Sequence, residues 1–504
     1  MGKIVIDGDN LKLDEIESVA YKLSEVELSS RSKTKIQKSR ALLKKLLKQG
    51  KRIYGVNTGF GSLSDIDIKD KDLSNLQMNM IRSHCTGVGE PFSEDIVRAM
   101  MLLRANVLAK GYSGVRVELV EFLIKLLNER IHPFIPSQGS VGASGDLAPL
   151  SHLASVIIGE GKAYYKGKLL PSKEIFKNAG LSPLTLEAKE GIALINGTQT
   201  MTAIASLSLL RTERLIDTAD LAGAMTLDAL KGSIDPFDEK IHNVRPYEGQ
   251  KLSASRIKKF IEDSELWNSH RGKLKIQDSY SLRCMPQVHG AIRETLKFIR
   301  GILEIEINSA TENPLIFSDE GEILSGGNFH GEPIALVSDF MGIALTELGN
   351  ISERRIERLM NPNLNEGLPA FLSKNPGLES GLMLTHVTAA SLASENRTLS
   401  HPASVDNIPI SADQEDHVSM GVTSARKAMK ILENTERIIS IELLCASQAL
   451  DLRKPLKSSP LIEKILKMIR KKVPFIEKDR MLDQDIEEIF KLIHSPEWKK
   501  LIIF

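Results

Sequence analysis

The segment Ala143-Ser144-Gly145 offers the most unusual chemistry in the sequence. If the backbone bends tightly, the amide nitrogen of Gly145 can attack the carbonyl carbon of Ala143, and loss of water closes a five-membered ring. Loss of the Ser144 hydroxyl as a second water leaves an exocyclic methylidene. Gly145 has no side chain to obstruct this attack and tolerates the dihedral angles that it requires. The tripeptide can therefore form 4-methylideneimidazol-5-one, an electrophile that no ordinary side chain provides.

Two other functions of this glycine-rich stretch fit the spacing less well. A phosphate-binding P-loop ends in Lys-Ser or Lys-Thr, and no lysine occurs between Gly139 and Leu150. A nucleophile elbow reads Gly-x-Ser-x-Gly, whereas Gly145 directly follows Ser144. A turn that only joins two helices is the commonest explanation of a bare Ala-Ser-Gly, so the interpretation depends on the rest of the chain.

The composition is that of an ordinary globular protein, with 42% hydrophobic and 26% charged residues. At 504 residues the chain is long enough for two or three structural regions. Its 66 Lys and Arg nearly cancel 65 Asp and Glu, which leaves a formal net charge of +1. Nucleic-acid binders normally show a basic excess or a basic stripe. We therefore expect no nucleic-acid partner.

Cysteine usage and the N-terminus indicate a reducing compartment. Cys85, Cys284 and Cys445 lie far apart without CxxC spacing, so we expect no disulfide framework. Residues 1–15 lack the apolar core of a secretory signal. No uninterrupted apolar run reaches the roughly 20 residues that cross a bilayer. We expect a cytoplasmic protein with no membrane contact.

Helical periodicity dominates the elements that must position the chemistry. Apolar residues recur at steps of three, four or seven over residues 288–307, 334–348 and 425–450, which predicts long, partly buried helices. Residues 207–230 form a further long stretch without proline and are also predicted to be helical. Several such helices are typical of a bundle.

Strand signals are weaker and local. Residues 161–170, with the turn Lys166-Gly167-Lys168, predict one short hairpin. Glycine and proline are concentrated in loops, where a helical protein carries most of its chemistry. These loops cover residues 54–61, 136–149, 325–333 and 361–369.

Six segments, taken together, resemble the aromatic amino acid ammonia-lyase family, and they span the chain from about Tyr54 to Met420. Their sequences are Tyr54-Gly55-Val56-Asn57-Thr58-Gly59-Phe60-Gly61, Gly142-Ala143-Ser144-Gly145-Asp146-Leu147-Ala148-Pro149-Leu150-Ser151-His152, Asn196-Gly197-Thr198-Gln199, Gln277-Asp278-Ser279-Tyr280-Ser281-Leu282-Arg283-Cys284, Gly326-Gly327-Asn328-Phe329-His330-Gly331 and Gln414-Glu415-Asp416-His417-Val418-Ser419-Met420.

The resemblance implies a mainly α fold in two regions. Residues 1–200 would carry the electrophile, and residues 201–504 would form a central bundle of long helices and a C-terminal helical region. It also implies a homotetramer whose active sites each draw residues from more than one subunit. The implied cofactor is the electrophile formed autocatalytically from Ala143-Ser144-Gly145, with no metal and no dissociable group.

Roles in catalysis come from the same resemblance. Ser144 would become the reactive methylidene, and Tyr54 would act as the base at the β-carbon of the substrate. A free phenol has a pKa of about 10, so half-ionisation at pH 7 requires a downward shift of roughly 3 units. Helix N-termini and a nearby cation are expected to supply that shift.

Substrate binding is assigned in the same way. Arg283 would hold the substrate carboxylate through a bidentate fork, and Gln277 and Tyr280 would line the same polar pocket. Asn196 would bond either the carboxylate or the ring carbonyl of the electrophile. Two further roles complete the set: Phe329 would exclude water beside the electrophile, and Glu415 would reach either the amine or the side-chain ring of the substrate.

Selectivity is predicted to depend on Ser83-His84, which stand where phenylalanine-selective relatives carry Phe-Leu and tyrosine-selective relatives carry His-Leu. An imidazole has a donor and an acceptor that an apolar pocket would leave unpaired, at a cost of about 1–3 kcal/mol. His84 can offer the matching partner. Glu415 stands where phenylalanine-selective relatives tend to carry glutamine, which also favours a basic ring. The resemblance thus implies deamination of L-histidine to trans-urocanate and ammonia, the first step of histidine degradation.

Several alternatives stay open at this point. A phenylalanine or tyrosine lyase, or an aminomutase with the same electrophile, would differ mainly around Ser83-His84. Fumarase-like lyases also use helical bundles but need no Ala-Ser-Gly segment. A non-enzymatic relative would be expected to lack Tyr54, Ser144 or Arg283. The 11 histidines show no HxxxH spacing or His/Cys cluster, so no metal site is predicted.

Overall fold

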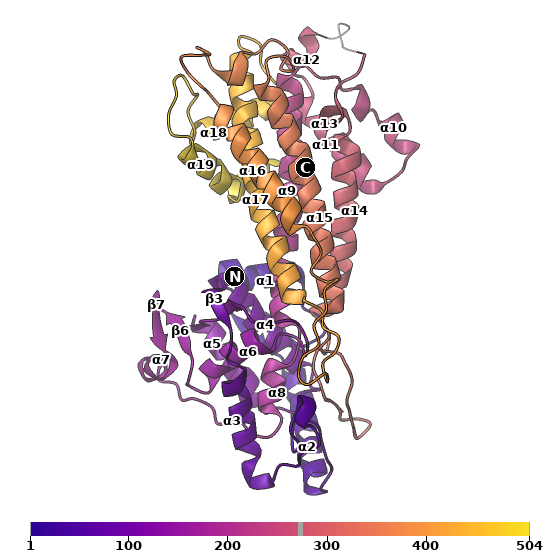
Figure 1. Cartoon of the computed structure of the whole chain (residues 1–504), viewed down its shortest axis with the longest axis vertical. Coiled ribbons are helices and arrows are strands. Elements are labelled where there is room, and N and C mark those ends of the chain that lie inside the picture. The colour runs from indigo at the N-terminus through magenta and orange to yellow at the C-terminus, as the bar shows by residue number, and fades with distance from the viewer. Residues whose placement is uncertain (1, 271–275, 503–504) are drawn as a thin grey trace. The chain divides into compact units, whose positions relative to one another are not determined.

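The structure, a computed structural model, describes residues 2–270 and 276–502 (Figure 1). Helices make up most of these residues, and the strands are short and confined to small sheets. The predicted mainly α fold is confirmed.

The chain forms two compact units. Unit 1 consists of residues 1–210, 300–339 and 402–426, and unit 2 of residues 211–299, 340–401 and 427–504. The later segments join unit 1 through backbone hydrogen bonds, from Ile316 to Tyr112 and from Met420 to Val141. The predicted boundary at residue 200 lies near the end of the first segment of unit 1, at residue 210. Unit 1 also contains two segments from the second half of the chain, so no single boundary divides the two units.

Unit 1 is built around α4 (Glu94–Ala109), whose side chains are buried on nearly every face and which packs against α1 and α5. The other helices that lie wholly in unit 1 are α1 (Leu13–Lys22), α2 (Ser30–Lys48), α3 (Leu73–His84), α5 (Val117–Asn128), α6 (Leu147–Ile157), α7 (Ser172–Ala179) and α8 (Glu190–Ile195).

The strands of unit 1 form four small sheets. β1 (Ile4–Ile6) pairs in parallel with β2 (Val26–Leu28), whereas the remaining pairs are antiparallel. These are β3 (Val88–Pro91) with β5 (Pro136–Gln138), β6 (Lys162–Tyr165) with β4 (His132–Pro133) and β7 (Lys168–Pro171), and β8 (Leu315–Phe317) with β9 (Glu322–Leu324). The β6–β7 pair confirms the predicted hairpin, with Lys166 and Gly167 both at positive φ in its turn.

Unit 2 consists of helices in its described residues. Those wholly within it are α10 (Glu239–Asn243), α11 (Glu248–Ile261), α12 (Glu265–Ser269), α13 (Tyr280–Arg283), α16 (Met383–Leu399), α18 (Pro460–Arg470), α19 (Asp483–Ile493) and α20 (Pro496–Ile502). Short 3-10 turns occupy Gly61–Leu63, Asp70–Asp72, Asp235–Phe237 and Ala370–Leu372.

Four long helices contain residues of both units and confirm the four predicted long helical stretches. They are α9 (Gln199–Ala229), α14 (Met285–Glu306), α15 (Glu332–Met360) and α17 (Gly421–Leu452). Among the described helices, α15 is the one long and apolar enough to cross a membrane by length and composition, but 72% of its apolar window is buried in the protein. That burial is typical of a core helix, and the cytoplasmic location stays a prediction.

Two helix starts place the Ala-Ser-Gly segment. α6 begins at Leu147, two residues after Gly145, and Pro149 lies in its first turn, where a missing N–H breaks no hydrogen bond. The carboxylate of Asp146 accepts from the backbone N–H groups of Thr200 and Met201, at 2.7 and 3.0 Å, and so caps the first turn of α9. Asp146 therefore holds the starts of two helices together beside the tripeptide.

Candidate active site

Ala143-Ser144-Gly145 lies in a tight bend. Gly142 and Gly145 face each other across the bend in an antiparallel bridge, and both have positive φ, 73° and 77°. Ala143 is buried against Val418 and Met420. The bend thus brings the two ends of the tripeptide together, as attack of the Gly145 nitrogen on Ala143 requires.

Gly145 also lies directly against the backbone of Gly197. A Cβ added at Gly145 would meet the Gly197 carbonyl oxygen at 2.2 Å, so only glycine fits. The neighbouring N–H of Asp146 donates to the same carbonyl at 2.7 Å. Glycine is therefore required here both by φ and by the close approach of another backbone.

Asn196 is held in place on every side. Its side-chain amide donates to the carbonyl oxygen of Ser144 at 2.9 Å, and its side-chain oxygen accepts from the N–H of Asn313 at 2.7 Å. The buried guanidinium of Arg104 donates to the carbonyls of Ala193 and Asn196, at 2.7 and 3.0 Å. The amide of Asn196 is thus fixed on the carbonyl of Ser144 rather than free to turn.

The bend opens on a cavity of about 270 Å³ whose lining residues all belong to unit 1. Six of the predicted site residues line it: Tyr54, His84, Ser144, Asn196, Phe329 and Glu415. No Arg or Lys is found among the described residues of this lining.

Glu415 lies closest to the reactive side chain. The hydroxyl of Ser144 donates to Glu415 Oε1 at 3.1 Å. The charge of Glu415 also acts on the pKa of both Tyr54 and His84. The carboxylate therefore lies near all three chemically active side chains of the cavity.

The pKa of Tyr54 is shifted in the direction opposite to the one expected from the sequence. Its hydroxyl accepts from the N–H of Gly61 at 2.9 Å, but burial and the charge of Glu415 raise the pKa of Tyr54 above its usual value. The sequence-based argument expected helix N-termini and a cation to lower it. Within the described chain the cavity lining has no such cation, and burial outweighs the single backbone donor.

His84 ends α3 with a defined tautomer. Its Nδ1 lies 2.8 Å from the carbonyl oxygen of Met80, which can only accept, so Nδ1 carries the proton in the neutral ring. Burial lowers the pKa of His84 and favours that neutral ring. Nε2 is then an acceptor. Ser83 is exposed and outside the cavity, with its hydroxyl 3.0 Å from His84 Nδ1, so it contacts His84 rather than the cavity.

Gln277, Tyr280 and Arg283 belong to unit 2 and are not among the residues that line the cavity. Tyr280 is 72% exposed, and the guanidinium of Arg283 lies over its ring, 4.7 Å from the centroid. Gln277 is also exposed. Within one chain the structure therefore brings six of the predicted site residues to the cavity and leaves these three outside it.

Some lining residues were missed by the sequence argument. Asn313 and Ser411 line the cavity, and Asn313 also accepts from the N–H of Gly326 at 2.7 Å. The signal for Asn313 was a polar residue before Pro314 in a loop-forming pair. Arg104 had no local signal, because it lies within the apolar pattern of α4 and acts through distant carbonyls.

The family model for aromatic amino acid lyase matches residues 11–471. A histidine ammonia-lyase of Natranaerobius thermophilus is 53% identical over 490 residues, which cover 97% of this chain and 96% of the relative. The crystal structure of histidine ammonia-lyase from Trypanosoma cruzi is similar, with a TM-score of 0.92 and 44% identity over 99% of this chain and 95% of that one. Tyrosine aminomutase from Streptomyces globisporus gives a TM-score of 0.95 and 39% identity, with coverages of 99% and 98%. The chain belongs to the aromatic amino acid lyase family.

Proposed function

We propose that the protein is a histidine ammonia-lyase, which converts L-histidine into trans-urocanate and ammonia. The observation that supports this most directly is the Ala143–Gly145 bend, which opens on a cavity where His84 presents an acceptor nitrogen. The relatives named histidine ammonia-lyase, which match nearly the whole chain, support the same substrate.

Ala143, Ser144 and Gly145 are proposed to form 4-methylideneimidazol-5-one with loss of two waters. The bend fits this group, because Gly142 and Gly145 already face each other and a side chain at Gly145 is excluded. When formed, the group supplies an electrophilic carbon that takes up the amine of the substrate and makes it a better leaving group.

Asn196 is proposed to polarise the ring carbonyl. The carbonyl of Ser144 is the one retained by the ring, and the Asn196 amide donates to it at 2.9 Å. This contact favours the ring carbonyl over the substrate carboxylate, the two alternatives that the sequence left open. A fixed donor at an oxygen where negative charge grows stabilises the transition state.

Glu415 and Tyr54 are proposed to handle protons. Glu415 accepts from the side chain of Ser144, so we assign it to the amine end of the substrate rather than to the imidazole. Tyr54 is assigned to the β-proton, as the family resemblance implies. Burial raises the pKa of Tyr54 in the single chain, so we propose that a cation from a neighbouring subunit favours the phenolate in the complex.

His84 is proposed to read the substrate ring. With Nδ1 bonded to the Met80 carbonyl, its Nε2 can accept a hydrogen bond from an imidazole N–H. A phenyl ring would leave that acceptor unpaired. The expected discrimination is that of one buried hydrogen bond, about 1–3 kcal/mol.

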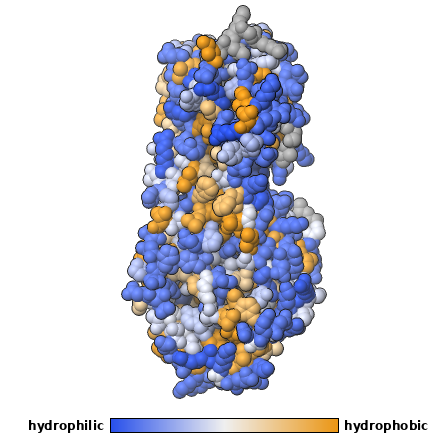
Figure 2. Space-filling model, turned by 90° about the vertical axis from the view of Figure 1, so that its right-hand side faces the viewer, coloured by the Kyte–Doolittle hydropathy of each residue, from blue (hydrophilic) through white to orange (hydrophobic). Residues whose placement is uncertain are grey.

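The substrate carboxylate needs a cation that the cavity of one chain does not provide. We propose that Gln277, Tyr280 and Arg283 of a neighbouring subunit complete the site in a homotetramer. Exposed apolar side chains on α14, α15 and α16 of unit 2 support such an assembly: Phe298, Phe340, Ile343, Leu384 and Val387. Figure 2 shows the side that carries α14, where apolar patches interrupt a polar surface. Light scattering should give four chains per particle, and a monomer active at wild-type rates would contradict the shared site.

Ultraviolet absorbance tests the function. Purified protein is incubated separately with L-histidine, L-phenylalanine and L-tyrosine, since deamination creates a conjugated acrylate that the amino acids lack. Absorbance should rise mainly with L-histidine. A rise mainly with another amino acid would overturn the selectivity, and an aminomutase would consume its substrate while giving little acrylate.

Two variants separate the electrophile from the selectivity. Ser144→Ala should lose at least about 1,000-fold in kcat, or ~4 kcal/mol of transition-state stabilisation, and its mass should lack the loss of two waters expected in the wild type. His84→Leu should reduce turnover of L-histidine far more than that of L-phenylalanine. Full activity in Ser144→Ala, or equal losses on both substrates in His84→Leu, would remove the respective assignment.

A further inference from the structure

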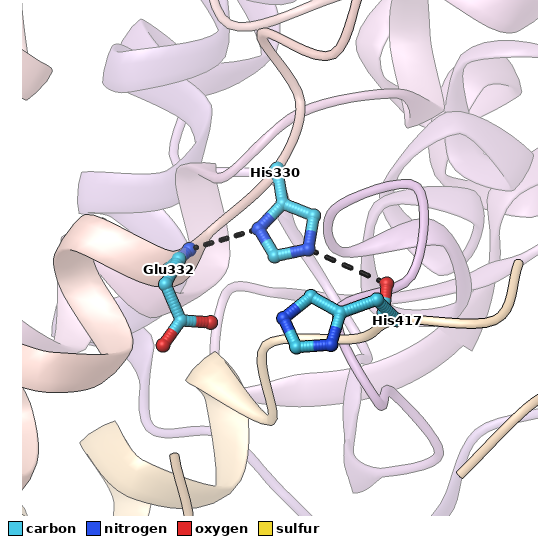
Figure 3. Close-up of side chains that lie close together, drawn as sticks. All are labelled: His330, Glu332 and His417. Atoms are coloured by element: carbon cyan, nitrogen blue, oxygen red, sulfur yellow. Dashed lines mark hydrogen bonds between the residues drawn. The ribbon is translucent and has the colours of Figure 1, made fainter. Parts of the chain in front are cut away.

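His330, Glu332 and His417 form a compact cluster in unit 1 (Figure 3). One donor atom from each of the three side chains lies within 4.8 Å of those of the other two. His330 and Glu332 flank the start of α15, whereas His417 comes from the segment before α17. Because the two segments are far apart in the sequence, the spacing of histidines along the chain gave no sign of the cluster.

We propose that these three side chains bind a divalent zinc-class metal ion. Two imidazoles and one carboxylate are a ligand set that binds Zn²⁺, with a water in the fourth position. The set is distinct from the proposed catalytic groups, since none of the three residues lines the cavity.

The hydrogen bonds of His330 favour Nδ1 as the ring nitrogen that would bind the metal ion. Its Nε2 lies 3.4 Å from the carbonyl oxygen of His417, which can only accept, so this long contact favours a proton on Nε2. Nδ1 then has the lone pair, in agreement with the N–H of Glu332 that points to it at 3.4 Å. Metal-bound histidines usually donate their other ring N–H to a carbonyl or carboxylate in this way.

The contact from Glu332 N–H is long and therefore weak, so a metal ion would displace it at little cost. The rings of His330 and His417 are stacked, with centroids 5.6 Å apart and an angle of 6° between their planes. His417 is exposed and free to swing inward. Its ring therefore provides the movement that binding requires.

Glu332 supplies the negative charge. Its Oε2 is buried and, among the described residues, makes no hydrogen bond. A buried carboxylate oxygen without a donor is costly, and a cation removes that cost. This is a second observation, independent of the proximity of the histidines, that indicates a missing positive partner.

The geometry needs only small adjustments. Ligands of tetrahedral Zn²⁺ at about 2.1 Å lie about 3.4 Å from one another, so donor atoms within 4.8 Å must close by up to about 1.4 Å. Rotation of the His417 ring can supply much of this, because that side chain is exposed.

A metal here would join two loops that line the cavity. Phe329 precedes His330 in one loop, and Ser411 and Glu415 precede His417 in the other. The bound ion would hold these loops in register without touching the substrate. Protease cleavage within residues 402–420 should accordingly be several-fold slower with the metal than without it.

Cobalt binding tests the site directly. Protein without a polyhistidine tag is treated with a chelator, freed of it and titrated with Co²⁺, whose visible absorbance reports four-coordinate binding where Zn²⁺ is silent. The wild type should bind one Co²⁺ per chain, and Zn²⁺ should displace it. Absence of saturable binding at one equivalent would overturn the proposal.

Variants locate the ion. His417→Ala should lose at least about 100-fold in Co²⁺ affinity, more than the roughly 10–100-fold typical of losing an outer partner, and Glu332→Gln should be weakened in the same direction with nearly unchanged shape. The matched control is His401→Ala, another exposed histidine outside the cluster, which should bind as the wild type does. Circular dichroism confirms that each variant is folded. Wild-type affinity in His417→Ala, or equal loss in His401→Ala, would contradict the assignment.

Discussion

Asp146 in unit 1 and Asp220 in unit 2 are both fully buried, yet their pKa values move in opposite directions. Burial raises the pKa of Asp146 to about 7, and the N–H groups of Met201 and Thr200 offset only part of that increase. Burial acts on Asp220 as well, but Arg293, His289 and Arg256 outweigh it and lower the pKa of Asp220 to about 2. The same side chain is thus a poorly stabilised anion in one place and a strongly stabilised one in the other.

The difference lies in what the nearby cations bind. Around Asp220, Arg293 and Arg256 donate to Oδ2 at 2.6 and 3.1 Å, and His289 is 2.8 Å from Oδ1. Around Asp146, Arg104 instead donates to the carbonyls of Ala193 and Asn196. In unit 2 the cations thus neutralise the carboxylate of Asp220. In unit 1 the cation Arg104 instead fixes the backbone of Asn196, a predicted site residue.

Unit 1 also contains a pair of buried charged groups that do not form a hydrogen bond with each other. Lys189 and Glu312 are both buried, with Nζ and Oε1 3.8 Å apart, longer than a hydrogen bond. Such incompletely bonded charges are costly in a protein interior. Glu312 directly precedes Asn313, whose N–H donates to Asn196, so this pair adjoins the network of a predicted site residue. The Asp220 cluster also contains a buried polar atom without a hydrogen-bond partner among the described residues, His289 Nε2, but its carboxylate is directly bonded to cations.

The largest expected effect is on the unit 2 cluster. Asp220→Asn should lower the free energy of unfolding by about 3–5 kcal/mol, because it removes the fully buried anion of the cluster and leaves Arg293 and Arg256 with only the partly exposed Asp217. Urea unfolding measures this, and the activity per folded molecule should stay close to that of the wild type. A stable variant with poor turnover would show that Asp220 serves the site and would break the comparison.

The second prediction concerns the unit 1 network. Asn196→Ala should reduce kcat about 100–1,000-fold, or ~2.7–4 kcal/mol, since a fixed donor to the ring carbonyl is lost. Steady-state kinetics with L-histidine measures this, and mass spectrometry shows whether the two waters are still lost. If the variant instead retains its kcat and only unfolds more easily, the network is structural like that of Asp220.

The two aspartates should also give opposite dependence on pH. Asp146 has a folded pKa of about 7, above the unfolded value of about 3.9, so the folded state keeps a proton that the unfolded state loses. Stability therefore falls as pH rises from about 4 to 7, by at most about 1.4 kcal/mol per pH unit. Asp220 has a depressed pKa, so its contribution is present above about pH 4 and is lost as pH falls toward 2.

Unfolding by urea at several pH values, compared between the wild type and Asp146→Asn, isolates the first effect because all other groups titrate in both proteins. The decline between pH 4 and 7 should be smaller in the variant. Identical slopes would mean that Asp146 is ionised in the folded protein at all these pH values.

The smallest expected effect tests how far burial determines the contribution of an aspartate to the stability of the cluster. Asp217 bonds the same guanidinium, Arg293, at 2.7 Å, but its side chain is 22% exposed. Asp217→Asn should lower the free energy of unfolding by about 1 kcal/mol or less, because water screens the pair and Asp220 remains. A loss as large as that of Asp220→Asn would show that the number of acceptors, rather than their burial, determines the stability of the cluster.

Sequence alone predicted the elements that local chemistry determines. Periodic apolar residues predicted α14, α15 and α17, a long stretch without proline predicted α9, and the Lys166-Gly167 turn predicted the β6–β7 hairpin. It could not predict that residues 300–339 and 402–426 pack with unit 1, because those contacts join segments far apart in the chain.

The residues of the candidate site were likewise predicted in part. Tyr54, Asn196 and Glu415 lie in recognisable motifs, and all three line the cavity. Arg104 and the raised pKa of Tyr54 were not predicted, since both depend on tertiary burial. The roles of Gln277, Tyr280 and Arg283 stay predictions, because none of the three lines the cavity of the single chain.

The bend at Ala143–Gly145 also bears on when the protein becomes an enzyme. Its shape depends on the carbonyl of Gly197, which accepts from Asp146, and on the N–H of Met420, which donates to Val141. During synthesis, residue 420 leaves the ribosome long after the tripeptide does. If ring closure requires the held bend, a nascent or truncated chain that ends before Met420 does not form the electrophile.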